Sequence, residues 1–233
     1  MFLNLKKTWK GYTFLDLILI VLGLGSGTVL GIIFKAEWFI IVFTNVWLLC
    51  VFTQAKGKII TQLLGIIGSA IYFFICLEQK YYGEGFIYLF GFIPLYIYGL
   101  IHWLRTRKNN SNEVTVRSKL SKKEIIIASI IYVVLCVFIT FILIKTNTTQ
   151  PIINILSVLS LIPALYLLVR RIRFNQVLFL VNDLIVPFLW IILIINGNLS
   201  FIPMCICYFF QLTYDIYGIF EWKKLEEKQK NNI

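Results

Sequence analysis

Apolar stretches of roughly twenty residues alternate with short polar segments along the chain. A helix needs about 17–25 mostly apolar residues to cross the hydrocarbon core of a bilayer. Eight stretches approach or reach that length, and they span residues 13–34, 37–54, 59–77, 85–104, 124–145, 152–169, 175–195 and 200–222. The stretch 37–54 is the weakest of them, because Thr44, Asn45 and Thr53 interrupt it. The pattern predicts an all-α integral membrane protein with eight transmembrane helices.

The composition agrees with this prediction. Hydrophobic residues make up 59% of the 233 residues, and the mean hydropathy is +0.85, whereas a soluble domain is about 45–50% apolar. The net charge of +11 could indicate nucleic-acid binding. The basic residues, however, lie in short segments beside the apolar stretches, which is the positive-inside pattern of membrane proteins. We therefore predict a partner in the lipid bilayer and none in nucleic acid.

The basic residues also predict the orientation of the chain. With the N-terminus in the cytoplasm, 19 of the 22 lysines and arginines lie in cytoplasmic segments, and only Lys35, Lys80 and Lys145 lie on the other side. This asymmetry predicts a multi-pass protein of the cell membrane with both termini cytoplasmic. The stretch 13–34 follows a group of lysines, as a signal sequence does, but it is too long for one. We expect it to be an uncleaved first helix.

Few residues offer catalytic or metal-binding chemistry. Five cysteines lie within or beside the apolar stretches, without the spacing of a disulfide framework or of a metal site. The single histidine, His102, precedes Trp103 near the end of a stretch, where we expect an interfacial polar residue rather than a proton relay. The sequence therefore predicts no enzyme, no bound metal and no cofactor.

One six-residue motif occurs twice. Tyr98-Gly99-Leu100-Ile101-His102-Trp103 ends the fourth stretch, and Tyr217-Gly218-Ile219-Phe220-Glu221-Trp222 ends the eighth, 119 residues later. Both read Y-G-x-x-x-W, so the glycine and the tryptophan share one helix face. The motif aligns the three stretches within 37–104 with the three within 152–222. Both triplets begin outside and end inside, which predicts a SWEET-like 3+1+3 parallel repeat with one extra N-terminal span.

The repeat divides the chain into six parts. They are an N-terminal tail with the extra helix (1–34), a first three-helix repeat (35–104), a linker (105–123), a joining helix (124–150), a second three-helix repeat (151–222) and a charged cytoplasmic tail (223–233). The linker is polar and basic, so we expect a solvated cytoplasmic loop beside anionic lipid.

Ionisable residues within the predicted helices are candidates for function, because a charge at membrane depth is costly. Asp183 follows Asn182 in the middle of the seventh helix, and Asp215 lies in the eighth. For Asp183, an interhelical hydrogen bond that holds the bundle together is the alternative role. Asp16 lies near the start of the first helix, where we expect a solvated interfacial residue.

Matching helix faces carry further polar and aromatic side chains. The eighth helix has Gln211, Asp215, Gly218 and Trp222 at spacings of four, three and four, and the fourth helix has Phe92, Tyr96, Gly99 and Trp103 at the same spacings. The third helix has Gln62, Gly65, Ser69 and Tyr72 on one stripe. Trp103 and Trp222 have an alternative role as members of an interfacial aromatic belt.

Three segments resemble the Pnu family of vitamin and nucleoside transporters. The first leads from Tyr81-Tyr82-Gly83-Glu84 through Pro94-Leu95-Tyr96 to the first motif. The second runs from Asn175-Gln176 to Asn182-Asp183 and resembles the N-W-x-x-W-x-x-x-D segment of the family. The third contains the second motif and ends at Lys223-Lys224. The likeness departs from the family at Tyr96, where an amide residue is common, and at Gln176, where tryptophan is usual.

The resemblance implies a SWEET-like bundle that often assembles as a homotrimer. It also implies facilitated diffusion of nicotinamide riboside, or of a closely related aromatic vitamin or nucleoside, into the cell, where a cytoplasmic kinase would trap the cargo. Thiamine or a deoxynucleoside is the alternative cargo within the family. A small membrane enzyme or an accessory subunit is the alternative outside it.

A substrate site follows from these expectations. The two motif tryptophans and Tyr96 are expected to stack on the cargo or gate it, while the carboxylates and Asn182 bind its polar groups. The predicted substrate-binding residues are Gln62, Tyr72, Tyr96, Gly99, Trp103, Asn182, Asp183, Gln211, Asp215, Gly218 and Trp222.

Overall fold

The computed structural model of the protein describes residues 12–106, 113–117 and 119–231. Among these residues, eight helical segments are long and apolar enough to cross a membrane. In chain order they are α2 (Phe14–Ile33), α3 (Trp38–Ala55), α4 (Ile60–Glu78), α5 (Tyr82–Ile87) with η1 (Tyr88–Phe92) and α6 (Ile93–Thr106), α7 (Lys122–Lys145), α8 (Pro151–Val169), α9 (Asn175–Ile185) with α10 (Pro187–Ile195), and η2 (Leu199–Phe201) with α11 (Ile202–Lys230). The prediction of an all-α chain with eight membrane-length helices is confirmed.

Caps and prolines decide where several segments begin and bend. Thr13 with Asp16 and Ser121 with Glu124 form capping boxes, which satisfy the first backbone N–H groups of α2 and α7. The fourth segment widens into the π-helix η1 just before Pro94, a residue that has no N–H to donate to the preceding turn. The break between α9 and α10 likewise comes at a proline.

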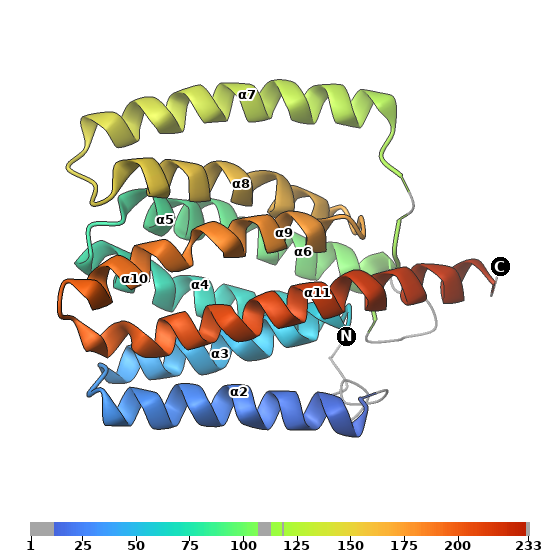
Figure 1. Ribbon diagram of the computed structural model, residues 1–233. Coiled ribbons are helices and arrows are strands. Elements are labelled where there is room, and N and C mark those ends of the chain that lie inside the picture. Colours follow the sequence, from blue (N-terminus) through green and yellow to red (C-terminus); the bar gives the residue numbers. More distant parts are fainter. Residues whose placement is uncertain (1–11, 107–112, 118, 232–233) are drawn as a thin grey trace.

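Six of the segments pack side by side in a closed ring. Along the ring, α3 contacts α4, α4 contacts α6, α6 contacts α8, α8 contacts α9, α9 contacts α11, and α11 returns to α3. The other two lie outside the ring on opposite sides, α2 against α3 and α11, and α7 against α8 and α5 (Figure 1). Segments from the two halves of the chain therefore enclose one common interior.

The two outer helices pack differently. Gly23, Gly27 and Gly31 lie on the buried face of α2, where their missing side chains let the helix approach α3 closely. In α7, which the structure describes in full, Leu143 alone is buried. The rest of its apolar surface is available to lipid, as expected of a helix at the edge of a membrane bundle.

Residues 113–117 of the predicted linker pack against the inner ends of the helices, the ends at which α3 and α11 carry Lys56 and Trp222. Val114 is fully buried, and its amide donates to the carbonyl oxygen of Gly57 at 2.7 Å. Gln229 of α11 forms two further hydrogen bonds with this segment. The prediction of a solvated loop is therefore wrong for Val114, whereas the other four residues are half-exposed and part of the linker lies outside the described residues.

Candidate functional site

Aromatic side chains from both halves of the chain pack together inside the bundle. Tyr72 of α4 lies 4.3 Å from Tyr88 of η1 and 4.9 Å from Phe43 of α3 between ring centroids, and Tyr88 stacks on Phe92 at 4.4 Å. Trp190 of α10 meets Tyr72 edge to face at 5.8 Å. Each of these rings is at most 2% exposed. They form one continuous aromatic cluster.

Three buried carboxylates lie beside the aromatic cluster. Glu84 of α5, Asp183 of α9 and Asp215 of α11 are all 0% exposed. Glu84 accepts hydrogen bonds from the Tyr72 hydroxyl at 3.3 Å and from Ser157 of α8. Asp183 and Asp215 interact with each other, yet none of their oxygens has a well-formed hydrogen bond with a described residue. Because an unpaired buried charge is strongly destabilising, this pair is suited to hold a proton or a cation.

The amide side chains near the carboxylates differ in what they contact. Gln211 accepts a hydrogen bond from Nε1 of Trp47 at 2.9 Å and also lies within reach of Asp183. Asn182 donates to the Ser157 carbonyl oxygen at 3.0 Å and to two serine hydroxyls of α8. The donors of Asn182 are therefore engaged in joining α9 to α8.

Each motif glycine accommodates a glutamine from its own half of the chain. A methyl group added to Gly99 would lie 2.9 Å from Cδ of Gln62, and one added to Gly218 would lie 2.9 Å from Cδ of Gln176. Both glutamines are fully buried, and neither Oε1 atom has a hydrogen-bond partner among the described residues. An unpaired amide oxygen from each half thus lies near the inner end of the bundle.

The two motif tryptophans contact each other. Their ring centroids are 6.3 Å apart, with the planes at 64°, and Trp103 is 1% and Trp222 0% exposed. Trp222 donates to the Gln54 carbonyl oxygen at 2.8 Å, whereas Nε1 of Trp103 has no partner in the described part of the chain. The alternative role in an interfacial belt is therefore wrong for both residues, because they face the interior rather than lipid.

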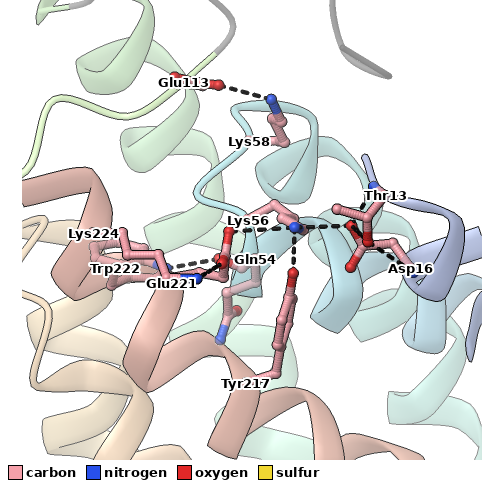
Figure 2. Close-up of polar contacts among 10 residues, drawn as sticks. All are labelled: Thr13, Asp16, Gln54, Lys56, Lys58, Glu113, Tyr217, Glu221, Trp222 and Lys224. Carbon is pink, nitrogen blue, oxygen red and sulfur yellow. Dashed lines mark hydrogen bonds and ion pairs between the residues drawn. The ribbon is translucent and has the colours of Figure 1, made fainter. Parts of the chain in front are cut away.

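A buried ion-pair network surrounds the inner end of α3 (Figure 2). Nζ of Lys56 lies 2.9 Å from Asp16 of α2 and 3.2 Å from Glu221 of α11, and it also contacts the hydroxyl of Tyr217. Burial lowers the pKa of Lys56, but the contacts with Tyr217 and Asp16 outweigh burial and leave that pKa above its ordinary value. The prediction that Asp16 is a solvated residue is wrong, because its side chain is 1% exposed and joins α2 to the ring.

Comparison with known proteins now places the chain in a family. The model of the nicotinamide mononucleotide transporter family matches residues 37–224. The chain belongs to this family. It is similar to the nicotinamide riboside transporter PnuC of Neisseria mucosa, with 22% identity over 227 residues that cover 96% of this chain and 86% of the relative. It shares the fold of the crystal structure of the vitamin B3 transporter PnuC, with a TM-score of 0.83, 23% identity and 97% of each chain covered.

The resemblance to the Pnu family is thereby confirmed, and the family is one of transporters rather than enzymes. Most predicted site residues fall into two buried groups. Beside the aromatic cluster and the carboxylates lie Tyr72, Asn182, Asp183, Gln211 and Asp215, and toward the inner end lie Gln62, Gly99, Trp103, Gly218 and Trp222. Tyr96 lies beside the aromatic cluster, because its ring is 5.5 Å from that of Phe92.

Sequence reasoning missed Glu84, Trp47 and Tyr208. The fourth segment begins at Tyr82 rather than at residue 85, so Glu84 lies inside the helix. It was missed because the apolar stretch in the sequence begins only after this charge. The hydroxyl of Tyr208 lies 3.2 Å from that of Tyr72. The one available signal was the Tyr-Tyr-Gly-Glu segment of the family, because it brings an acid to the edge of a span.

Proposed function

We propose that the protein carries a cationic aromatic nucleoside, for which nicotinamide riboside is the best candidate, across the cell membrane by facilitated diffusion. The observation that carries the proposal is the meeting of three buried carboxylates with a buried aromatic cluster. Carboxylates offset the charge of a pyridinium ring where water is excluded, and aromatic faces stack on it. The relative from Neisseria mucosa is named for the same cargo.

The charge of the site favours a nucleoside over its phosphorylated form, although the family model is named for the mononucleotide. Within the described residues, the buried basic side chains are Lys56 and Lys58, and both lie at the inner end rather than beside the carboxylates. A phosphate placed among three carboxylates would be repelled in a medium of low dielectric constant. We therefore expect the riboside, and not the mononucleotide, to enter the site.

Within this proposal, the inner residues form the route by which cargo leaves. Within the described residues, the amide oxygens of Gln62 and Gln176 and the indole N–H of Trp103 have no hydrogen-bond partner. They are therefore available to the ribose hydroxyls and the carboxamide of the cargo. The contact between Trp103 and Trp222 lies on the same route, and we assign it the role of a gate.

We further infer a SWEET-like parallel duplication. The packing order α3, α4, α6 in the first half has the same sequence of neighbours as α8, α9, α11 in the second. The pair of Gln62 with Gly99 recurs as Gln176 with Gly218. These recurrences support two three-helix repeats that face the same way.

The outer helices support an extension of this repeat. The capping acid of α2, Asp16, pairs with Lys56 at the end of the next helix, and the capping acid of α7, Glu124, pairs with Arg170 at the end of the next helix. We therefore propose that the extra helix α2 corresponds to the joining helix α7, so that the duplicated unit has four helices rather than three.

Three wider proposals follow from the family resemblance and the positive-inside pattern. Both termini are cytoplasmic, three copies form a homotrimer, and a cytoplasmic kinase phosphorylates and traps the cargo. Labelling of cysteines introduced at the termini, from each side of the membrane, tests the orientation. The mass of the purified complex tests the homotrimer. Uptake in cells without the kinase activity tests the trapping.

Transport by purified protein in liposomes tests the main proposal. Labelled nicotinamide riboside should equilibrate down its gradient at the same rate with and without an ion gradient, and the mononucleotide should not. Competition by thiamine and deoxyadenosine tests the alternative cargoes. Asp183→Asn and Asp215→Asn should slow the flux about tenfold or more, while Glu78→Gln, which alters an exposed carboxylate, leaves it unchanged. Absence of equilibration, or equal flux of the mononucleotide, overturns the proposal.

A further inference from the structure

The two outer helices leave different spaces against the ring. Counted from the capping acid of α2, the residues seven, eleven and fifteen positions later are Gly23, Gly27 and Gly31. Counted in the same way from the capping acid of α7, they are Ile131, Leu135 and Ile139. Glycines allow close approach of two helices, and large side chains hold them apart. α2 is therefore seated on α3, whereas the corresponding face of α7 is held away from its neighbours.

An apolar groove runs along α7 as a result. Its outer part has a volume of about 700 Å³ between α7 and the segments α5, η1, α6 and α8. Its inner part has a volume of about 390 Å³ and extends along α7 and α8 to Ile125 and Tyr166. Leu95, Leu135 and Ile162 line both parts, so the groove is continuous.

The inner end of the groove lies at a cluster of arginines. Glu124, the residue before Ile125, pairs with Arg117 at 2.6 Å and with Arg170. Burial and the nearby charges of Arg117 and Arg170 lower the pKa of Arg171, so a third guanidinium lies close by. Within the described residues, the buried Nε atoms of Arg170 and Arg171 have no hydrogen-bond partner. Glu124 pairs with two of these three guanidinium groups, so the cluster keeps a net positive charge that attracts an anion.

We propose that an anionic phospholipid of the cytoplasmic leaflet occupies the inner part of this groove, with its acyl chains along Leu135 and Ile162 and its phosphate at Arg117 and Arg170. The dimensions agree, because the ten residues from Ile125 to Leu135 rise about 15 Å, which is half of a hydrocarbon core about 30 Å thick. Both Nη atoms of Arg117 already donate to Glu124, at 2.8 and 2.6 Å. The charges still agree, because the guanidinium groups outnumber the carboxylate and each guanidinium has five N–H donors, more than Glu124 uses.

This lipid site depends on the proposed orientation and not on the cargo. It is also particular to one side of the molecule. On the α2 side, the corresponding acid, Asp16, is buried with Lys56, and glycines close the space that the groove occupies beside α7. The α2 side thus serves as an internal comparison, at which we expect no lipid.

Native mass spectrometry of the full chain in detergent tests the proposal. With phosphatidylglycerol and phosphatidylcholine at equal concentration, the protein should retain one phosphatidylglycerol per chain in preference. The double variant Arg117→Gln with Arg170→Gln should weaken this binding about 25-fold, since each basic residue near a lipid surface contributes about fivefold. The double variant Lys223→Gln with Lys228→Gln, which removes the same charge from the exposed side of α11, should bind as the parent does.

A second pair of variants tests the groove without changing charge. Leu135→Trp should fill the groove and release the lipid, while Val137→Trp should not, because Val137 is 68% exposed and does not line it. Circular dichroism establishes that each variant is folded. Equal retention of the two lipids, or displacement by soluble glycerol phosphate at the same concentration, would overturn the lipid assignment. A lipid-free oligomer that Leu135→Trp dissociates would also overturn it, because a second copy of the chain would then cover the groove.

Discussion

Replacement of Lys56 by methionine is expected to destabilise the protein strongly. The side chain of Lys56 is 6% exposed, and its Nζ lies 2.9 Å from Asp16, which is 1% exposed. Lys56→Met keeps most of the volume but leaves the Asp16 carboxylate buried without its cation. Loss of one partner of a buried ion pair costs about 3–5 kcal/mol. A chain of this size loses about 2–4 °C in melting temperature per kcal/mol, so we expect a decrease of about 6–20 °C.

A control with the same chemistry is available in the same network. Lys224 pairs with Glu221 at 3.1 Å, but its side chain is 72% exposed. Exposed pairs contribute about 0–1 kcal/mol, so Lys224→Met should change the melting temperature by only a few degrees. Thermal unfolding in one detergent measures both variants. The double variant Lys56→Met with Asp16→Asn should recover part of the loss, because no charge is then left buried. Equal decreases for the two methionine variants would refute the reasoning.

The same network predicts a pH dependence. The pKa of Lys56 in the folded protein lies above its ordinary value of 10.5, through Tyr217 and Asp16 and against the effect of burial. A pKa that folding raises adds stability that is complete below the ordinary value and is lost as the pH rises through the folded value. The difference in unfolding free energy between the parent and Lys56→Met should therefore stay constant through neutral pH and shrink only in strong alkali. A difference that vanishes near neutral pH would contradict this assignment.

Three further predictions concern the interior. Gly65→Ala places a methyl group 2.5 Å from Cζ of the Tyr96 ring and should lower the unfolding free energy by about 1–3 kcal/mol. The methyl group of Gly25→Ala meets no atom of the described residues within 4 Å, so that variant should be neutral in thermal unfolding. Trp222→Phe removes the hydrogen bond to the Gln54 carbonyl oxygen and should lower the unfolding free energy by about 1 kcal/mol more than Trp103→Phe does. Trp103→Phe should instead weaken the binding of the cargo, as measured by calorimetry. Glu84→Gln keeps the shape of a side chain bonded to Tyr72 and Ser157, so it should weaken binding of a cationic nucleoside more than that of a neutral one.

Much of the architecture could be predicted because it depends on local properties of the chain. Whether a stretch of about 20 residues leaves water for lipid depends on its own side chains, so the eight helices could be read from hydropathy. The recurrence of Y-G-x-x-x-W likewise identified two helix ends that contact each other through Trp103 and Trp222. The buried state of Asp183 and Asp215 followed from their position at membrane depth.

The partners of the polar residues depend instead on helices far apart in sequence. Asp16 was predicted to be solvated because it lies near the start of the first helix, at the interface, and Lys56 reaches it only when α3 packs on α2. Glu84 was missed because a span predicted from hydropathy is bounded at a charged residue, and Glu84 lies just before the stretch 85–104. In the folded chain, Tyr72 and Ser157 donate hydrogen bonds to that carboxylate. The sequence by itself determined which segments enter the membrane, since that is a balance between each segment and its solvent. Only the tertiary structure decided which buried charges meet, because that depends on how the helices pack against one another.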